Sequence, residues 1–206
     1  MNDRKDPILY IVIPCYNEQE VLPETSKRLR EKVQTLRQGG KIDADSRILF
    51  VNDGSKDATW EMIQKLHEEN SVFSGVNLSR NRGHQNALLA GIAVAAEHAD
   101  MIVSMDADLQ DPPSLLPEML ELLLSGEYDC AATRRTTREG EPPVRSWFAK
   151  KFYQIINKLS DTEIVDGARD FRLMSRKMTD AVLSMAEYNR FSKGIFSWVG
   201  FKTKWF

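Results

Sequence analysis

The sequence of 206 residues has little of what marks several common protein classes. Its two cysteines, Cys15 and Cys130, each lie in an apolar stretch, which predicts buried reduced thiols rather than disulfides or a paired-cysteine metal site. The longest apolar run, Ala87 to Ala96, is far shorter than the ~18 residues of a membrane-spanning helix. Met1 to Asp6 are polar and contain no signal-peptide core. We therefore expect a chain that does not cross a membrane.

Several catalytic signatures are missing as well. No Gly-x-Gly-x-x-Gly follows the first apolar run, which disfavours a dinucleotide-binding dehydrogenase. There is no P-loop, Gly-x-Ser-x-Gly or His-Glu-x-x-His, which removes the simplest NTPase, hydrolase and zinc-protease interpretations. Of the three histidines, His67 and His98 are typical helix residues, whereas His84 lies in a polar loop. The net charge of −2 gives no indication of a nucleic-acid partner.

The apolar residues that are present occur in short runs. Hydrophobic residues make up 42% and charged residues 28%, the balance of a globular domain. Runs with little polar interruption predict strands buried on both faces. The predicted strands are Leu9–Ile13, Ile48–Val51, Val72–Leu78, Met101–Met105 and Tyr128–Thr133. Helical patterns lie between them, and this alternation predicts an α/β fold with a doubly wound, mostly parallel sheet.

The pattern changes after Thr133. A polar loop over Arg134–Pro143 is followed by helical patterns at Arg145–Leu159, Ser175–Ala186 and Phe191–Val199. We expect one domain over 1–206, with an α/β half at 7–133 and loops and helices at 134–206. The helix at Arg145–Leu159 has an apolar face beside several basic residues, which fits either a membrane interface or ordinary packing on the sheet.

Polar residues follow each of the first four predicted strands. Open α/β sheets bind ligands at the carboxyl ends of their strands, so these residues indicate a crevice at one edge. Asp53 is expected either to accept hydrogen bonds from a nucleobase or to cap the next helix, with Ser55 and Asp57 as alternative caps. The four strand ends carry Pro14–Glu18, Asn52–Asp57, Ser79–Gln85 and Asp106–Gln110.

Asp106 and Asp108 form an Asp-x-Asp pair at this edge. Mg²⁺ and Mn²⁺ bind carboxylate oxygens together with substrate phosphates, and Gln110 offers a further neutral oxygen. The motif is common by chance, and a second copy occurs at Asp43-Ala44-Asp45. That copy precedes a strand and is interpreted as a solvated turn at the opposite edge.

Together these segments resemble the family 2 glycosyltransferases with the GT-A fold. The matching segments, in the family's order, are Ile13–Glu18, Val51–Ser55, Ser79–Gln85 and Met105–Pro113. The last two, with Asp170–Arg176 and the Arg190–Phe201 region, are similar to polyprenyl-phosphate and dolichyl-phosphate sugar transferases. The likeness runs from Tyr10 through nearly the whole chain.

The resemblance implies a role for each matching position. Donor binding would involve Pro14, Tyr16, Asn17, Glu18, Asp53, Ser55, Asp106, Ala107, Asp108 and Arg134. The metal, Mg²⁺ or Mn²⁺, would be held by Asp106, Asp108 and Gln110. Asp170 would lie near the reacting centre as a base or as a group that orients Arg172, with Asp108 the other catalytic residue. Arg172 and Arg190 would bind the acceptor phosphate. Arg169 before Asp170 departs from the family pattern, where a smaller residue is expected.

The implied reaction is inverting transfer of a sugar from a UDP- or GDP-sugar to a polyprenyl phosphate at the inner face of the cell membrane. The alternatives are a same-fold transferase for a soluble or cell-wall glycan and a non-catalytic nucleotide-sugar-binding module. Expected partners are the donor, the lipid phosphate and the membrane surface, with a homo-oligomer left open. Gly200–Phe206 looks cut in mid-element, and relatives continue into membrane helices, so we expect the cytoplasmic domain of a longer protein.

Overall fold

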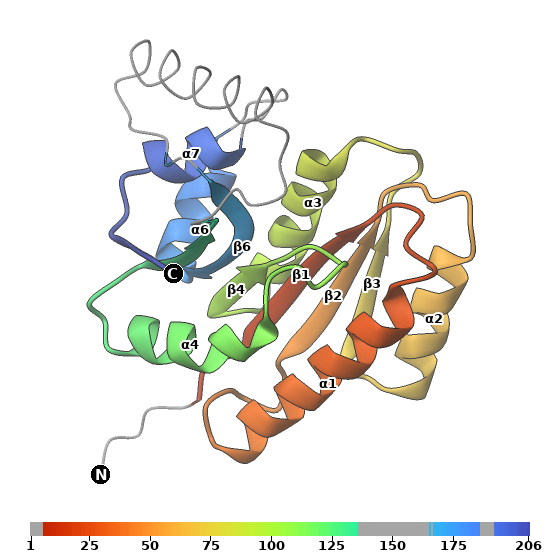
Figure 1. The fold of residues 1–206 in the computed structure, drawn as a ribbon, viewed down its shortest axis with the longest axis horizontal. Helices are drawn as coiled ribbons and strands as arrows, with labels where there is room; N and C mark the ends of the chain where they lie inside the picture. Colours follow the sequence, from red (N-terminus) through yellow and green to blue (C-terminus); the bar gives the residue numbers. More distant parts are fainter. Residues whose placement is uncertain (1–5, 136–164, 166, 186–191) are drawn as a thin grey trace.

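The computed structural model describes residues 6–135, 165, 167–185 and 192–206 as a mixed seven-stranded sheet between two layers of helices (Figure 1). The strand order is β3-β2-β1-β4-β6-β5-β7. The strands are β1 Leu9–Cys15, β2 Arg47–Asn52, β3 Phe73–Asn77, β4 Met101–Ser104, β5 Cys130–Arg134, β6 Ala168–Ser175 and β7 Thr203–Trp205. The helices are α1 Leu22–Gln38, α2 Thr59–Glu69, α3 His84–Ala96, α4 Leu116–Leu124 after a 3-10 turn at Pro113–Leu115, α6 Arg176–Leu183 and α7 Ser192–Trp198.

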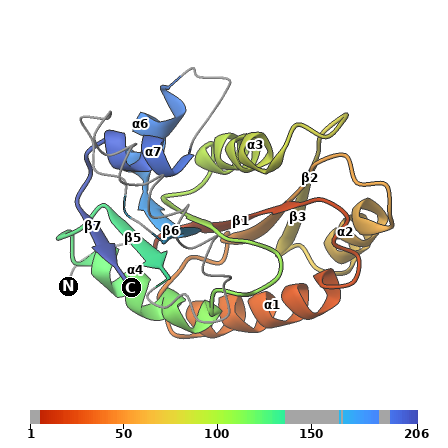
Figure 2. The same cartoon turned by 45° about the horizontal axis from the view of Figure 1, so that its top comes forward.

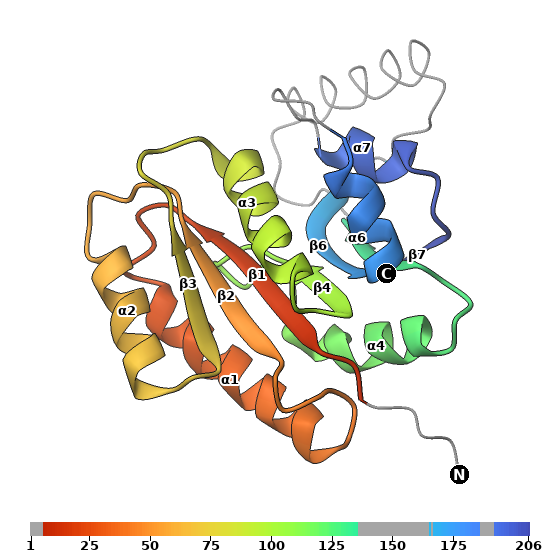
Figure 3. The same cartoon turned by 180° about the vertical axis from the view of Figure 1, so that it is seen from behind.

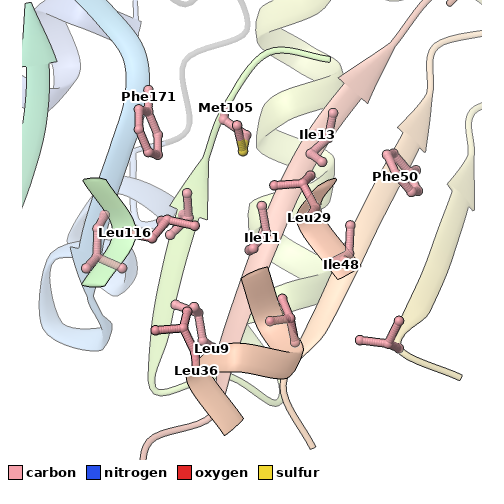
Figure 4. Packing of buried hydrophobic residues seen from close by; sticks show 14 of the residues in the cluster. Leu9, Ile11, Ile13, Leu29, Leu36, Ile48, Phe50, Met105, Leu116 and Phe171 are labelled. Atoms are coloured by element: carbon pink, nitrogen blue, oxygen red, sulfur yellow. The ribbon is translucent and has the colours of Figure 1, made fainter. Parts of the chain in front are cut away.

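The five strands expected from the apolar runs are all present, and β1 to β4 pair in parallel. Their runs are continuous because helices cover both faces of the sheet. Ile11 and Ile13 of β1 pack with Leu29 of α1 and Leu116 of α4 on one face (Figure 4). Val12, between them, packs on the other face with the α3 side chains. The GT-A architecture expected from the resemblance is confirmed.

The second half of the chain differs from the expectation of helices and loops. Two strands form there, β6 and β7, and both join the main sheet. β6 inserts between β4 and β5 and runs antiparallel to both, while β7 extends the sheet in parallel beyond β5. Charged residues interrupt β6, whereas its apolar residues Phe171 and Leu173 enter the core. This interruption hides the strand pattern.

The two helical layers lie on opposite sides of the sheet. Figure 2 shows α3 on one side and α1 on the other, and Figure 3 shows α3 and α6 across the rear face. α3 packs closely because it carries Gly91, where an added Cβ would lie 2.4 Å from Val12 Cγ1 and 2.6 Å from Val51 Cγ2. This close approach holds the helix firmly against β1 and β2.

Within the described residues, no helix combines the length and apolar character needed to cross a membrane. The predicted amphipathic helix at Arg145–Leu159 lies outside the residues that the structure describes.

Candidate active site

The loops after β1 and β2 hold each other in place at the carboxyl edge of the sheet. The backbone N–H of Asn17 donates to Ser55 Oγ at 3.0 Å, and Asn17 Oδ1 accepts from the Lys56 N–H at 2.8 Å. The Glu18 N–H donates to Thr59 Oγ1 at 2.9 Å. Asn17 has a left-handed φ of 56°, which turns the chain toward the second loop. The two loops therefore form one ordered wall.

The residues expected to hold the nucleoside fall into two environments. Tyr16 is 42% exposed at the end of β1, with an aromatic face available to a ligand. Pro14 is buried within β1. Asp53 is 2% exposed, and its Oδ1 and Oδ2 accept from the backbone N–H groups of Arg82 at 2.6 Å and Gly83 at 2.9 Å. Asp53 thus organises the loop that leads into α3, and its contact with a nucleobase stays a prediction.

The Asp-x-Asp segment follows β4 and is anchored from α1. The Ala107 carbonyl accepts a hydrogen bond from Thr25 Oγ1 at 2.5 Å. Asp108 is exposed, and its Oδ1 accepts from the Gln110 N–H at 3.2 Å. Leu109 between them has a φ of 53°, so the backbone makes a tight turn. Asp108 and Gln110 are therefore presented on one short turn, as a shared ligand role requires.

The downstream end of this segment is anchored by Asp111. Its Oδ2 lies 3.2 Å from Arg169 Nη1 of β6, and Thr133 Oγ1 of β5 donates to its Oδ1 at 3.4 Å. Burial raises the pKa of Asp111, although Arg169 opposes that shift. Neither partner was predicted from sequence. In the sequence, Arg169 was noted only because it departs from the family pattern. That departure was the available signal for its ion pair with Asp111.

The centre of the site joins three elements. His84 Nε2, at the start of α3, lies 3.5 Å from Asp106 Oδ1 after β4 and 3.4 Å from Asp170 Oδ2 of β6. The side chain of Asp170 is only 16% exposed. Ser104 Oγ donates to the Asp170 carbonyl at 2.6 Å and so ties β6 to β4. In the described part of the chain, the ligand atoms of His84, Asp106 and Asp170 all lie within 4.8 Å of one another.

The charges at this edge are predominantly negative. Burial, followed by the charge of Asp170, raises the pKa of Asp106, while His84 acts in the opposite direction. Burial and the charges of Asp108 and Asp106 raise the pKa of Glu18. A contact with Asp170 raises the pKa of His84 against the effect of burial. Converging carboxylates with raised pKa values fit a hard divalent cation, whose charge would relieve their repulsion.

The predicted cationic residues do not all reach this edge. Arg134 is exposed at the end of β5. Arg172 is 2% exposed, with its guanidinium 4.4 Å from the Phe196 ring centre and 5.4 Å from that of Trp205. Its Nη1 lies 3.4 Å from Cys130 Sγ. The guanidinium is enclosed by these aromatic rings in the described structure, and the expected role of Arg172 in acceptor binding stays a prediction. Arg190 lies outside the described residues.

Comparison with known proteins agrees with this geometry. The family model for glycosyl transferase family 2 matches residues 10–183. An uncharacterised glycosyltransferase of Synechocystis is 41% identical over 194 residues, which are 94% of this chain and 58% of the relative. A prophage bactoprenol glucosyl transferase homolog of Escherichia coli K12 is 37% identical over 195 residues, covering 94% of this chain and 60% of the relative.

A solved structure has the same fold. It is a mannosyltransferase from Pyrobaculum calidifontis in complex with GDP-Man and Mn²⁺, with a TM-score of 0.59 and 16% identity over 96% of this chain and 54% of that one. The chain spans about three fifths of the length of the curated relatives named above, 58% and 60%. The extent of the family match and the identity to both relatives show that the chain belongs to glycosyl transferase family 2.

Proposed function

We propose that this chain is the catalytic domain of an inverting, metal-dependent transferase that moves a sugar from a nucleotide diphosphate to a polyprenyl phosphate. The observation that carries the proposal is the meeting of Asp106 of the Asp-x-Asp segment, on the donor side, with Asp170 of β6 at one sheet edge. The relative named as a bactoprenol glucosyl transferase homolog supports the lipid acceptor. The neighbour solved with GDP-Man and Mn²⁺ supports a nucleotide-sugar donor and a metal.

On the donor side, the joined loops after β1 and β2 form a wall for the nucleoside, with Tyr16, Asn17, Glu18 and Ser55 along it. Asp106, Asp108 and Gln110 would hold Mg²⁺ or Mn²⁺ beside the diphosphate. When bound, the cation supplies Lewis-acid stabilisation of the negative charge that accumulates on the leaving diphosphate. The anchors at Thr25 and Asp111 fix both ends of this segment, so the ligand oxygens need little rearrangement.

On the acceptor side, a lipid phosphate is already ionised at neutral pH and needs positioning rather than deprotonation. Arg190 would supply a guanidinium group that grips this phosphate through two hydrogen bonds, whereas Arg134, exposed at the end of β5, would meet a phosphate of the donor. Asp170 then acts by orienting the reacting groups. Attack on the anomeric carbon from the side opposite the leaving diphosphate inverts its configuration.

The lipid acceptor places this domain beside the inner face of the cell membrane. Trp198 of α7 is 65% exposed, and aromatic side chains of this kind favour the interfacial region of a bilayer. The division into a nucleotide-binding half at 7–133 and an acceptor-side half at 134–206 belongs to this proposal.

The first test is calorimetric binding of UDP-glucose, UDP-GlcNAc and GDP-mannose, each with and without Mn²⁺ or Mg²⁺. We expect one donor to bind, and only with the cation present. Transfer is then measured with a short-chain polyprenyl phosphate and, in parallel, with soluble glycans. Transfer to a glycan hydroxyl alone would assign Asp170 the role of general base and reject the lipid acceptor. Binding without any transfer would favour a non-catalytic module.

A further inference from the structure

His84 is the member of the central cluster to which none of the above assigns a function. It is the first residue of α3 and lies between two carboxylates from different strands. Its Nε2 is 3.5 Å from Asp106 Oδ1 on the donor side and 3.4 Å from Asp170 Oδ2 on the acceptor side. A single imidazole nitrogen thus contacts both halves of the reaction centre.

The backbone around His84 is firmly held. The buried Asp53 accepts hydrogen bonds from the N–H groups of Arg82 and Gly83, the two residues before His84. Gly54, at a φ of 67°, lets this loop pass closely, since a Cβ there would lie 2.5 Å from Asn81 N. Further along α3, the close packing at Gly91 prevents the helix from sliding over the sheet. The backbone from which the His84 side chain extends is therefore held in place, unlike that of a histidine on a free surface loop.

The two carboxylates need such a contact. Asp106 and Asp170 offer oxygens within 4.8 Å of each other, and burial, followed by the charge of Asp170, raises the pKa of Asp106. Two carboxylates at this separation repel each other, and the repulsion is strong where they are partly buried. A donor placed between them offsets the repulsion and sets their separation.

From this geometry we infer that His84 is a positioning residue, which holds the Asp170 carboxylate at a set distance from Asp106 so that acceptor and donor meet in line. The role requires a hydrogen-bond donor at the Nε2 position and makes no use of proton transfer. The inference rests on the proposed function, because it assumes that a sugar moves across the space between these carboxylates.

Three substitutions separate positioning from other roles. His84→Gln places an amide N–H near the Nε2 position, His84→Asn ends about one bond shorter near Nδ1, and His84→Leu removes the donor at similar size. Misplacement of a reacting group by about 1 Å can cost up to 10²-fold in rate, so we expect kcat to fall at least about 10-fold in His84→Asn and His84→Leu. We expect His84→Gln to stay within about threefold of wild type, and metal-dependent donor affinity to stay within about twofold in all three. His98→Asn, exposed just beyond the other end of α3, is the matched control.

Each other result rejects the inference. Unchanged kcat in His84→Leu shows that the contact is dispensable. Equal loss in His84→Gln and His84→Asn shows that imidazole chemistry is needed. Loss of metal-dependent donor binding makes His84 a metal ligand instead. A crystal structure of His84→Leu gives a readout that does not depend on turnover, since we expect the Asp106 and Asp170 carboxylates to move apart and unchanged positions would overturn the proposal. A wild-type protein that binds no donor and transfers no sugar would instead count against the proposed function alone.

Discussion

The loops after β1 and β2 are joined by hydrogen bonds from backbone N–H groups to the side chains of Asn17, Ser55 and Thr59. β6 is held at the site by its pairing with β4 and β5 and by charged side chains. On the β6 side, Arg169 pairs with Asp111, and Arg172 is enclosed between aromatic rings. These hydrogen bonds link the two loops directly and make the donor wall self-supporting. The acceptor side instead depends on long-range contacts between charged or polar groups, so substitutions there should affect turnover and stability rather than donor binding.

The largest effect should come from Asp170, the carboxylate of β6 nearest the donor side. Asp170→Asn keeps the size but loses the charge that orients the reacting groups, and we expect kcat to fall about 10²–10³-fold. Donor affinity with Mn²⁺ should change by less than about threefold, since the donor wall is untouched. Asp180→Asn, an exposed carboxylate on α6, is the control. If donor affinity fell as far as kcat, the two sides of the site would not be separable.

Asp108 offers the complementary test on the donor side. Asp108→Asn replaces a charged ligand by a neutral one, and we expect nucleotide affinity measured with Mn²⁺ to fall at least about 10-fold. Affinity measured with EDTA should not change. Asp45→Asn alters the second Asp-x-Asp copy, which the structure places before β2 at the opposite edge, and should leave binding as in wild type. Equal weakening with and without Mn²⁺ would remove Asp108 from the metal site.

Substitutions of Arg172 test whether a charged residue on the acceptor side contributes to stability without binding substrate. Methionine fills the space between Phe196 and Trp205 without a buried charge, and among the described residues no carboxylate forms an ion pair with Arg172. We therefore expect Arg172→Met to change the free energy of unfolding by less than about 1 kcal/mol. Arg172→Lys should cost about 1–2 kcal/mol, because a compact ammonium cannot stack on both rings.

Urea unfolding measures both Arg172 variants, and the acceptor KM should match wild type in each. A raised KM for polyprenyl phosphate in a variant of unchanged stability would return Arg172 to the acceptor site. That outcome would require the guanidinium to leave the rings when substrate binds.

The sequence predicted the first half of the fold well because β1, β2 and β4 are buried on both faces and their apolar runs are easily recognised. The position of the candidate site at the carboxyl edge of the sheet could also be predicted, since parallel strands place Glu18, Asp106 and Asp108 together whatever the details of the loops. β6 was missed because Arg169, Asp170 and Arg172 interrupt its apolar residues. Its pairing with β4 and β5 is set by contacts between distant parts of the chain.

The individual contacts of the site residues were harder to predict than the position of these residues at the sheet edge. The capping alternative for Asp53 was wrong, because its partners are the N–H groups of Arg82 and Gly83 before α3 rather than those of the next helix, α2. The contacts of His84 depend on where α3 meets β4 and β6, which no local pattern encodes. The acceptor role of Arg172 was predicted from the resemblance alone. The burial of its side chain against α7 could not be predicted, because the residues that enclose it come from distant parts of the sequence.

The smallest effect concerns the repulsion among donor-side carboxylates. Burial and the charges of Asp108 and Asp106 raise the pKa of Glu18, so the folded state binds this proton more tightly than the unfolded chain does. The ionised carboxylate therefore destabilises the fold, and the cost grows as pH rises from about 4 through the raised pKa. In metal-free protein, Glu18→Gln should increase the free energy of unfolding at pH 7 by about 0.5–1 kcal/mol.

Urea unfolding at pH 7 and at about pH 3 measures this difference, which should disappear at the lower pH because Glu18 is then almost fully protonated in both states. Saturating Mn²⁺ should reduce the difference at pH 7, since the cation offsets the same repulsion. Glu20→Gln, exposed on the same loop, should show no pH-dependent gain and serves as the control. A gain for Glu18→Gln of equal size at both pH values would mean that packing, not charge, limits stability on the donor side. Repulsion among the carboxylates would then not be what limits stability on that side.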